Sequence, residues 1–138
     1  MFFCRNPPWR TSNNDKTSMW NVFKMTGFSL TKGKFFPGGD LSMVIAAPQN
    51  DNYLGAVYVC KDCFDSNNRQ DHITVSGLQM GEGFGEATAA CDIDNDGFDD
   101  LIVGAPTYSE NRRNVNVGRV HVFQNVDNEA MHTLTSVR

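Results

Sequence analysis

The chain has 138 residues with a formal net charge of −4, and 40% of its residues are hydrophobic while 20% are charged. This length is typical of one ordinary domain, and the composition is that of a globular rather than a disordered chain. The acidic balance and the lack of a basic tract argue against nucleic acid or an anionic membrane surface as the main partner.

The N-terminal residues are not expected to form a signal peptide. The opening MFFC is apolar but is followed by RNPP, so it lacks the apolar core of a signal peptide. No window approaches the roughly 18 apolar residues that a membrane helix needs. We therefore expect no direct membrane contact by this segment, and either a cytosolic protein or an incomplete chain.

Short β-rich runs separated by turn residues dominate the sequence. Ten Phe, twelve Gly and no convincing helical periodicity favour strands joined by tight turns. Residues 1–26 are polar, contain prolines and are expected to be irregular. In chain order, the expected strands are residues 41–46, 56–60, 72–75, 101–103 and 119–123. The sequence therefore predicts an all-β fold.

Three landmarks occur twice in the same order, which indicates an internal repeat. GFS at 27–29 corresponds to GFG at 83–85, VIAAP at 44–48 to IVGAP at 102–106, and GAVYV at 55–59 to GRVHV at 118–122. Each unit would hold four antiparallel strands, which is one blade of a β-propeller. The predicted architecture is a partial β-propeller of two four-stranded blades.

The stretch DIDNDGFDD at 92–100 predicts a bound calcium ion. Crowded carboxylates repel one another, and a hard cation that takes six to eight oxygen ligands would compensate this repulsion. Gly97 permits a sharp turn, and Asp99 is expected to face away from the ion. Position 103 is valine rather than the bidentate glutamate of an EF-hand. The predicted ligands are the carboxylates of Asp92, Asp94, Asp96 and Asp100 and the backbone oxygen of Phe98.

A solvated turn rich in aspartate and glycine is the alternative interpretation of this loop. The first unit has KFFPGGD in the corresponding place, without the alternating carboxylates, and is expected to bind no metal.

The landmarks resemble the FG-GAP repeat of integrin α-subunit propellers. GEGFG, DIDNDGFDDLIVGAP and GRVHVF are similar to a calcium-bearing blade, whereas the first unit keeps only the frame, with Gly-Phe for Phe-Gly and Ala-Ala-Pro for Gly-Ala-Pro. The resemblance implies a fragment of a seven-bladed propeller. The expected organisation is an irregular segment at 1–26, a blade without a metal loop at 27–77 and a blade with the calcium loop at 78–138.

The resemblance also implies the function, which is cell adhesion without catalysis. The implied partners are an integrin β-subunit and an extracellular-matrix or cell-surface protein ligand. The implied location is the extracellular face of the plasma membrane, within a longer single-pass receptor. The alternatives are the FG-GAP propeller of a secreted enzyme, such as a phosphatidylinositol-glycan phospholipase, or a lectin-like repeat protein.

Strand parity assigns the loops to two ends of the blades. The calcium loop lies at one end, and the loop after Gly104-Ala105-Pro106 lies at the other, where integrin α-subunits are expected to meet their partners. Exposed arginine and aromatic side chains often anchor partners, so we expect Tyr108, Arg112 and Arg113 to bind a partner. The metal would be structural.

Cysteines and histidines offer weaker candidates for a site. Cys60 and Cys63 have CxxC spacing, but neither a second CxxC nor paired histidines complete a zinc site. A local disulfide or two free thiols remain open, and the pairing of Cys4 and Cys91 is undetermined. The histidines occur singly, without the sequence context of a catalytic triad.

Overall fold

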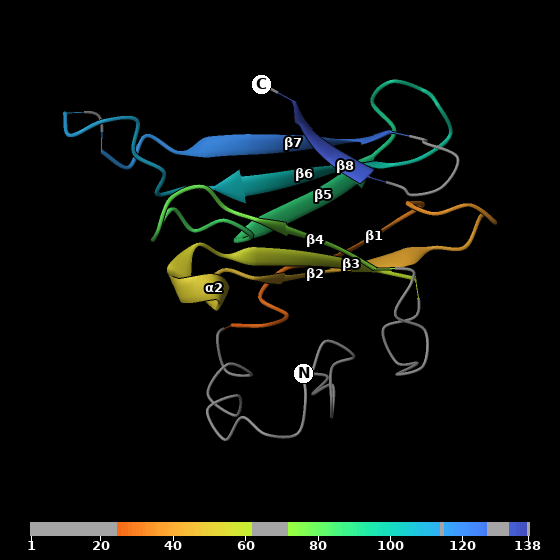
Figure 1. Cartoon of the computed structure of the whole chain (residues 1–138), viewed down its shortest axis with the longest axis horizontal. Helices are drawn as coiled ribbons and strands as arrows, with labels where there is room; N and C mark the ends of the chain where they lie inside the picture. Colours follow the sequence, from red (N-terminus) through yellow and green to blue (C-terminus); the bar gives the residue numbers. More distant parts are fainter. Residues whose placement is uncertain (1–24, 62–71, 114, 127–132, 138) are drawn as a thin grey trace, which may run out of the picture.

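The structure is a computed structural model that describes residues 25–61, 72–113, 115–126 and 133–137. These residues form two four-stranded antiparallel sheets with the strands paired in chain order (Figure 1). The first sheet contains β1 (Leu30–Gly33), β2 (Ser42–Ala47), β3 (Ala56–Cys60) and β4 (His72–Ser76). The second contains β5 (Ala87–Cys91), β6 (Asp100–Ala105), β7 (Arg119–Val126) and β8 (Thr133–Val137). The prediction of an all-β fold with two four-stranded blades is confirmed.

A single helical turn, α2 (Asn50–Tyr53), lies between β2 and β3 and was not expected from the sequence. Its four residues make little more than one turn, so no periodic pattern could reveal it. The Gly55 N–H donates to the Asn50 carbonyl at 3.0 Å and closes this connection before β3 begins.

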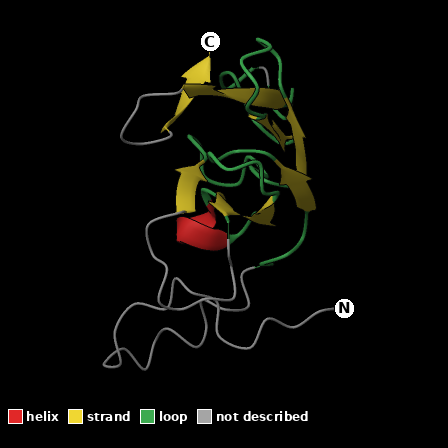
Figure 2. Cartoon of the chain, turned by 90° about the vertical axis from the view of Figure 1, so that its right-hand side faces the viewer, coloured by secondary structure: helices red, strands yellow, loops and turns green. Residues whose placement is uncertain are grey.

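The two sheets lie one above the other in both views (Figures 1 and 2), and β1 lies beside β5. Every residue of β3 is buried, whereas β7 alternates between buried and more exposed positions. Because the sheets face each other, their apolar side chains form one shared cluster. This cluster consists of Phe35, Phe36, Val44, Ala46, Val57 and Val59 from the first sheet and its β1–β2 loop, and of Phe84, Leu101, Val103, Ala105 and Phe123 from the second sheet and the loop before it.

The strand register corrects the alignment of the first repeat. Ala46 pairs with Ser29 through a 3.0 Å hydrogen bond, just as Gly104 pairs with Ala87. The Gly27 N–H donates to the Ala46 carbonyl at 2.8 Å, and the Gly85 N–H donates to the Gly104 carbonyl at 3.1 Å. Gly27 is therefore the equivalent of Gly85 rather than of Gly83.

The consequence is that Thr26, rather than Phe28, holds the position of the buried Phe84. Phe28 is 51% exposed, whereas Phe84 is fully buried. The sequence comparison matched the two Gly-Phe dipeptides by identity, and the backbone pairing shows that they differ by two positions in register.

The loops separate into two ends of the molecule. Residues 34–41 and 92–99 lie at one end, called here the aspartate-loop end, which is on the right in Figure 1. Residues 48–55, 77–86, 106–113 and 115–118 lie at the opposite end, called here the loop face. The connection at 62–71 and the segment 1–24 lie outside the described residues.

Cys60 is disulfide-bonded and Cys91 is a free, exposed thiol. Cys4 and Cys63 lie outside the described residues, and so does most of the segment 1–26. Within the described ranges, no helix is long and apolar enough to cross a membrane.

Candidate functional site

The aspartate loop, residues 92–99, is held between β5 and β6. Cys91 pairs with Asp100 at the base of this hairpin. Asp100 is the first residue of β6 and is only 1% exposed, so its carboxylate lies at the buried base of the loop. The remaining carboxylates of the loop project from a partly or fully exposed turn.

Three of the predicted ligands come together. One carboxylate oxygen each from Asp92, Asp94 and Asp100 lie within 4.8 Å of one another. Three negative charges at such distances repel one another by an amount that depends strongly on the local dielectric. A set of carboxylate oxygens is the donor set that calcium and magnesium prefer, so these residues fit a hard divalent cation.

Backbone N–H groups donate to all three carboxylates, and the bond to Asp94, from Asp96 N at 3.3 Å, is the longest. Asp92 accepts hydrogen bonds from Asp96 N at 3.1 Å and from Gly97 N at 2.9 Å. Asp100 accepts from Ile93 N at 2.9 Å and from Asn125 N at 2.8 Å. Each carboxylate oxygen can accept more than one bond, so these contacts orient the groups without using all of their lone pairs.

Asp96 and Phe98 are placed differently from the other three. The Asp96 carboxylate accepts the Phe98 N–H at 2.8 Å and is not part of the grouped oxygens. The Phe98 ring lies under the Lys34 ammonium group, 5.7 Å from nitrogen to ring centroid. The Asp96 carboxylate and the backbone oxygen of Phe98 are not among the grouped oxygens, and their role as ligands stays a prediction.

Asp99 contacts the first sheet instead of joining the group. Its Oδ2 accepts the Lys34 N–H at 2.6 Å, and its own N–H donates to the Lys34 carbonyl at 2.8 Å. The alternation of side chains along the loop had placed Asp99 outside the ligand set, and its observed partner lies on the neighbouring sheet.

Two residues that support the loop were missed in the sequence. Gln124 donates a side-chain hydrogen bond to Asp94, and the Asn125 N–H donates to Asp100. Both belong to β7, far along the chain from the loop. No spacing pattern marks them, and only the pairing of β6 with β7 brings them to the site.

The loop face carries the residues predicted to bind a partner, but these residues differ in their exposure to solvent. Arg112 and Arg113 are exposed. Tyr108 is partly buried, packs against the shared apolar cluster and lies under the Arg119 guanidinium, 4.9 Å from the ring centroid. Its position indicates a contribution to folding that the two arginines do not share.

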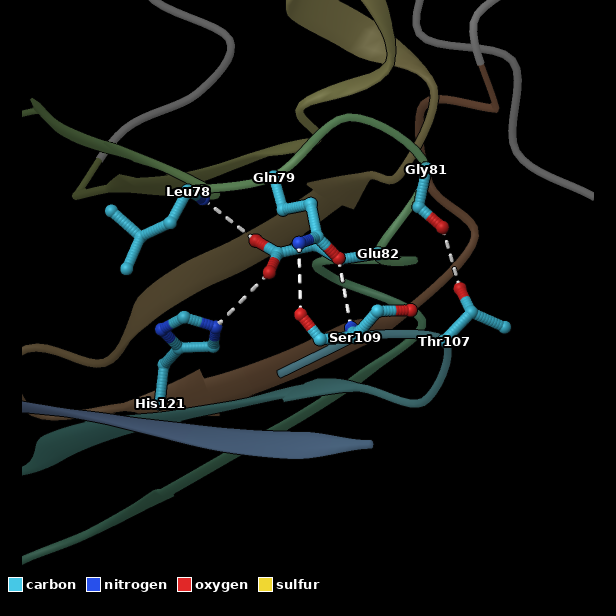
Figure 3. A network of polar contacts seen from close by, with 7 residues as sticks. All are labelled: Leu78, Gln79, Gly81, Glu82, Thr107, Ser109 and His121. Atoms are coloured by element: carbon cyan, nitrogen blue, oxygen red, sulfur yellow. Dashed lines mark hydrogen bonds and ion pairs between the residues drawn. The ribbon is translucent and has the colours of Figure 1, made fainter. Parts of the chain in front are cut away.

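Hydrogen bonds connect the two long loops of this face (Figure 3). The Gln79 side chain donates to the Ser109 carbonyl at 3.0 Å and accepts the Ser109 N–H at 2.8 Å. The Thr107 hydroxyl donates to the Gly81 carbonyl at 2.6 Å. The loop that contains Arg112 and Arg113 is thus anchored at its start.

A buried acid and a histidine lie beneath these loops (Figure 3). The Glu82 side chain is fully buried, and its Oε1 accepts the Leu78 N–H at 2.7 Å. Its Oε2 lies 3.7 Å from His121 Nε2, and both atoms otherwise lack a hydrogen-bond partner. Burial lowers the pKa of His121 and Arg119 lowers it further, while Glu82 opposes this shift.

Comparisons with known proteins agree with this architecture. Residues 84–123 match the FG-GAP repeat. The chain is 39% identical over 101 residues to integrin alpha-7 of Mus musculus, 37% over 89 residues to integrin alpha-3 of Mus musculus and 32% over 100 residues to integrin alpha-PS2 of Drosophila melanogaster. These alignments cover 72%, 64% and 70% of this chain, respectively.

The second sheet, with its hairpin loop, therefore contains an FG-GAP repeat. More particularly, the chain is homologous to a segment of integrin α-subunits, which confirms the family resemblance seen in the sequence. The aligned part of the chain spans only 8%, 8% and 7% of the length of these three relatives.

Proposed function

We propose that this chain is a calcium-binding propeller segment of an integrin α-like adhesion receptor and acts as a non-catalytic binding module. The observation that carries the proposal is the group formed by Asp92, Asp94 and Asp100 in the hairpin of an FG-GAP repeat. The integrin relatives favour this function over the propeller of a secreted enzyme or a lectin-like protein.

The cation would be held by the side chains of Asp92, Asp94, Asp96 and Asp100 and by the Phe98 carbonyl. Its contribution is to compensate the repulsion between the carboxylates and to stiffen the hairpin between β5 and β6. Asp92 and Asp100 are already oriented by backbone donors, which reduces the ordering that binding requires.

The partners in this proposal are an integrin β-subunit and an extracellular protein ligand, which bind at the loop face. Arg112 and Arg113 are exposed there on a loop whose start is anchored to the neighbouring loop. The segment would act outside the cell, at the plasma membrane, as part of a longer single-pass receptor. Residues 27–77 and 78–138 would be two of its blades, preceded by the irregular segment 1–26.

Calorimetric titration of the chain with calcium tests the cation site. We expect one ion per chain, because only the second sheet carries the alternating carboxylates. Two comparable sites would mean that the first sheet also binds, and no binding would leave the loop as a solvated turn.

The partner surface is tested in the receptor that contains this segment. Changing Arg112 and Arg113 to alanine should reduce binding of the β-subunit or ligand and leave the thermal midpoint unchanged. Lys32→Ala is the matched control, because Lys32 is exposed on β1 and not on the loop face. Equal losses of binding and stability, or a loss in the control, would contradict this assignment.

A further inference from the structure

The aspartate loop is attached to the first sheet as well as to its own hairpin. Asp99 exchanges two hydrogen bonds with Lys34, one through its Oδ2 at 2.6 Å and one through its N–H at 2.8 Å. Lys34 is the residue that follows β1, and its ammonium group also lies over the Phe98 ring. Two consecutive residues of the loop therefore contact a single residue of the other sheet.

Asn125 on β7 makes a second connection between the sheets. Its side-chain Nδ2 donates to the Phe35 carbonyl at 3.0 Å and to the Asp99 carbonyl at 3.3 Å. Its backbone N–H donates to Oδ1 of the predicted ligand Asp100 at 2.8 Å. Asn125 is only 1% exposed, so water does not compete effectively for these bonds.

The contact between the sheets leaves no room for adjustment at this point. A Cβ atom added to Gly33 would lie 2.6 Å from the Phe35 ring, 2.8 Å from Ala90 Cβ and 3.0 Å from Asp99 Oδ2. Packed interiors transmit small displacements because they contain few voids. A shift of Asp99 or Asp100 would therefore displace residues 33–35, at the end of β1 and the start of the next loop.

We propose that Asp99 and Asn125 are positioning residues. They couple the cation site of the second sheet to the packing of the first sheet against the second. This inference rests on the proposed calcium site. Lys34, Phe35, Asp99 and Asn125 are together called the clasp. The cation orders the loop that carries Asp99, and the clasp holds Asp100 through Asn125. Cation binding and the formation of the clasp therefore favour each other.

The coupling is reciprocal, because an interaction free energy between two binding events is the same in both directions. Cation binding stabilises the contact between the sheets, and an intact contact raises the affinity for the cation. The first sheet, which lacks the alternating carboxylates, thereby gains stability from an ion bound to its neighbour.

The first test measures calcium affinity of the full 138-residue chain and three variants. Asp99→Ala removes the acceptor of the Lys34 N–H, while Asp99→Asn keeps an oxygen in the same place without the charge. Asp40→Ala is the matched control, because Asp40 is an exposed carboxylate at the same end that pairs with Lys61 at 3.5 Å. Loss of a residue that orients a metal ligand typically costs about 10- to 100-fold in affinity.

We expect Asp99→Ala to weaken calcium binding by about tenfold, at the lower end of that range, and Asp99→Asn and Asp40→Ala to bind nearly as well as the original chain. Equal losses in Asp99→Ala and Asp99→Asn would mean that Asp99 acts through its charge. Unchanged affinity in Asp99→Ala would show that the clasp is not coupled to the site.

Hydrogen exchange gives a second measurement, which can be made on the original chain as well as on a variant. Calcium should slow exchange of the Lys34 amide by more than it slows the amides in the middle of β3. In Asp99→Ala this extra protection should disappear. If the original chain binds calcium and Lys34 shows no extra protection, the coupling is wrong although the site exists. If it binds no calcium, both the site and the coupling are wrong.

Discussion

The two sheets present loops at the same place, but only one loop carries carboxylates. Residues 34–41 follow β1 as residues 92–99 follow β5, and both loops lead into a strand whose first residue pairs with the last residue before the loop. Lys34 therefore stands where Asp92 stands in the second sheet. The length and register of the loop are kept, with a left-handed glycine at the equivalent positions Gly39 and Gly97, whereas its carboxylates are replaced.

A second difference lies in the interior. Phe84 precedes β5 and fits between the sheets, with its ring 5.1 Å from that of His121 and 6.0 Å from that of Phe123. The equivalent residue before β1 is Thr26, and the aromatic residue Phe28 is half exposed. Phe28 corresponds in register to the exposed Glu86, so the first sheet has no aromatic residue at the position that Phe84 fills.

The largest effect is expected from truncating Phe84. Phe84→Ala should lower the free energy of unfolding by about 3–5 kcal/mol, because it empties a fully buried site. Phe28→Ala should cost about 1 kcal/mol or less, since much of this ring already contacts water. Denaturant unfolding of the two variants compares these values. Similar losses would show that burial does not decide the contribution of these two rings to stability.

The second effect concerns the carboxylates of the aspartate loop. Asp96→Ala should weaken calcium binding by more than about 100-fold, because the loss of a ligand should cost more than the loss of a residue, such as Asp99, that only supports the loop. Isothermal titration against the Asp40→Ala control measures this change. A loss no larger than that of Asp99→Ala would mean that Asp96 is not a ligand.

The third effect separates the turn from its chemistry. Gly97 and Gly39 both have left-handed backbone angles, with φ of 94° and 80°. Alanine at either position should cost about 1–2 kcal/mol of stability, because a Cβ atom is strained in this region. Gly97→Ala should also weaken calcium binding, whereas Gly39→Ala should leave it unchanged. Parallel thermal melts and titrations are the measurements; weaker binding in Gly39→Ala would contradict the separation.

Much of the architecture could be predicted because it depends on local signals. The β-rich runs predicted β2, β3, β4, β6 and β7, whereas β1, β5 and β8 were implied only by the expectation of four strands in each unit. The alternation of aspartates identified the loop in which Asp92, Asp94 and Asp100 meet. The contacts of Gln124, Asn125 and Lys34 could not be predicted in this way. Each depends on pairing or packing between segments distant in sequence, and none of these residue types is unusual at its own position.

The prediction that Tyr108 binds a partner was limited in the same way, because local sequence does not show how a loop packs. An aromatic residue in a polar loop resembles a binding anchor, but its exposure depends on where the loop folds back. Here the ring packs against the shared cluster and under Arg119, so the sequence could not distinguish an anchor from a folding contact. Arg112 and Arg113 remain the sharper candidates for partner binding.

The smallest effect is expected at His121. This residue occupies the position of Tyr58 in the first sheet, since His121 pairs with Val103 as Tyr58 pairs with Ile45. Burial, with a smaller contribution from Arg119, lowers the His121 pKa below the 6.5 of an unfolded histidine, although Glu82 favours the charged form. The unfolded chain therefore binds a proton more readily than the folded chain. The free energy of unfolding should then fall as the pH decreases below 6.5.

Denaturant unfolding between about pH 7.5 and about pH 5 tests this expectation, with His121→Gln as the variant that cannot titrate there. The original chain should lose stability relative to His121→Gln on acidification. The matched control is Tyr58→Phe, whose difference from the original chain should not change over this range, because a tyrosine does not titrate there. A gain in stability relative to His121→Gln would mean that the attraction of Glu82 outweighs burial and that the pair becomes ionised within the fold.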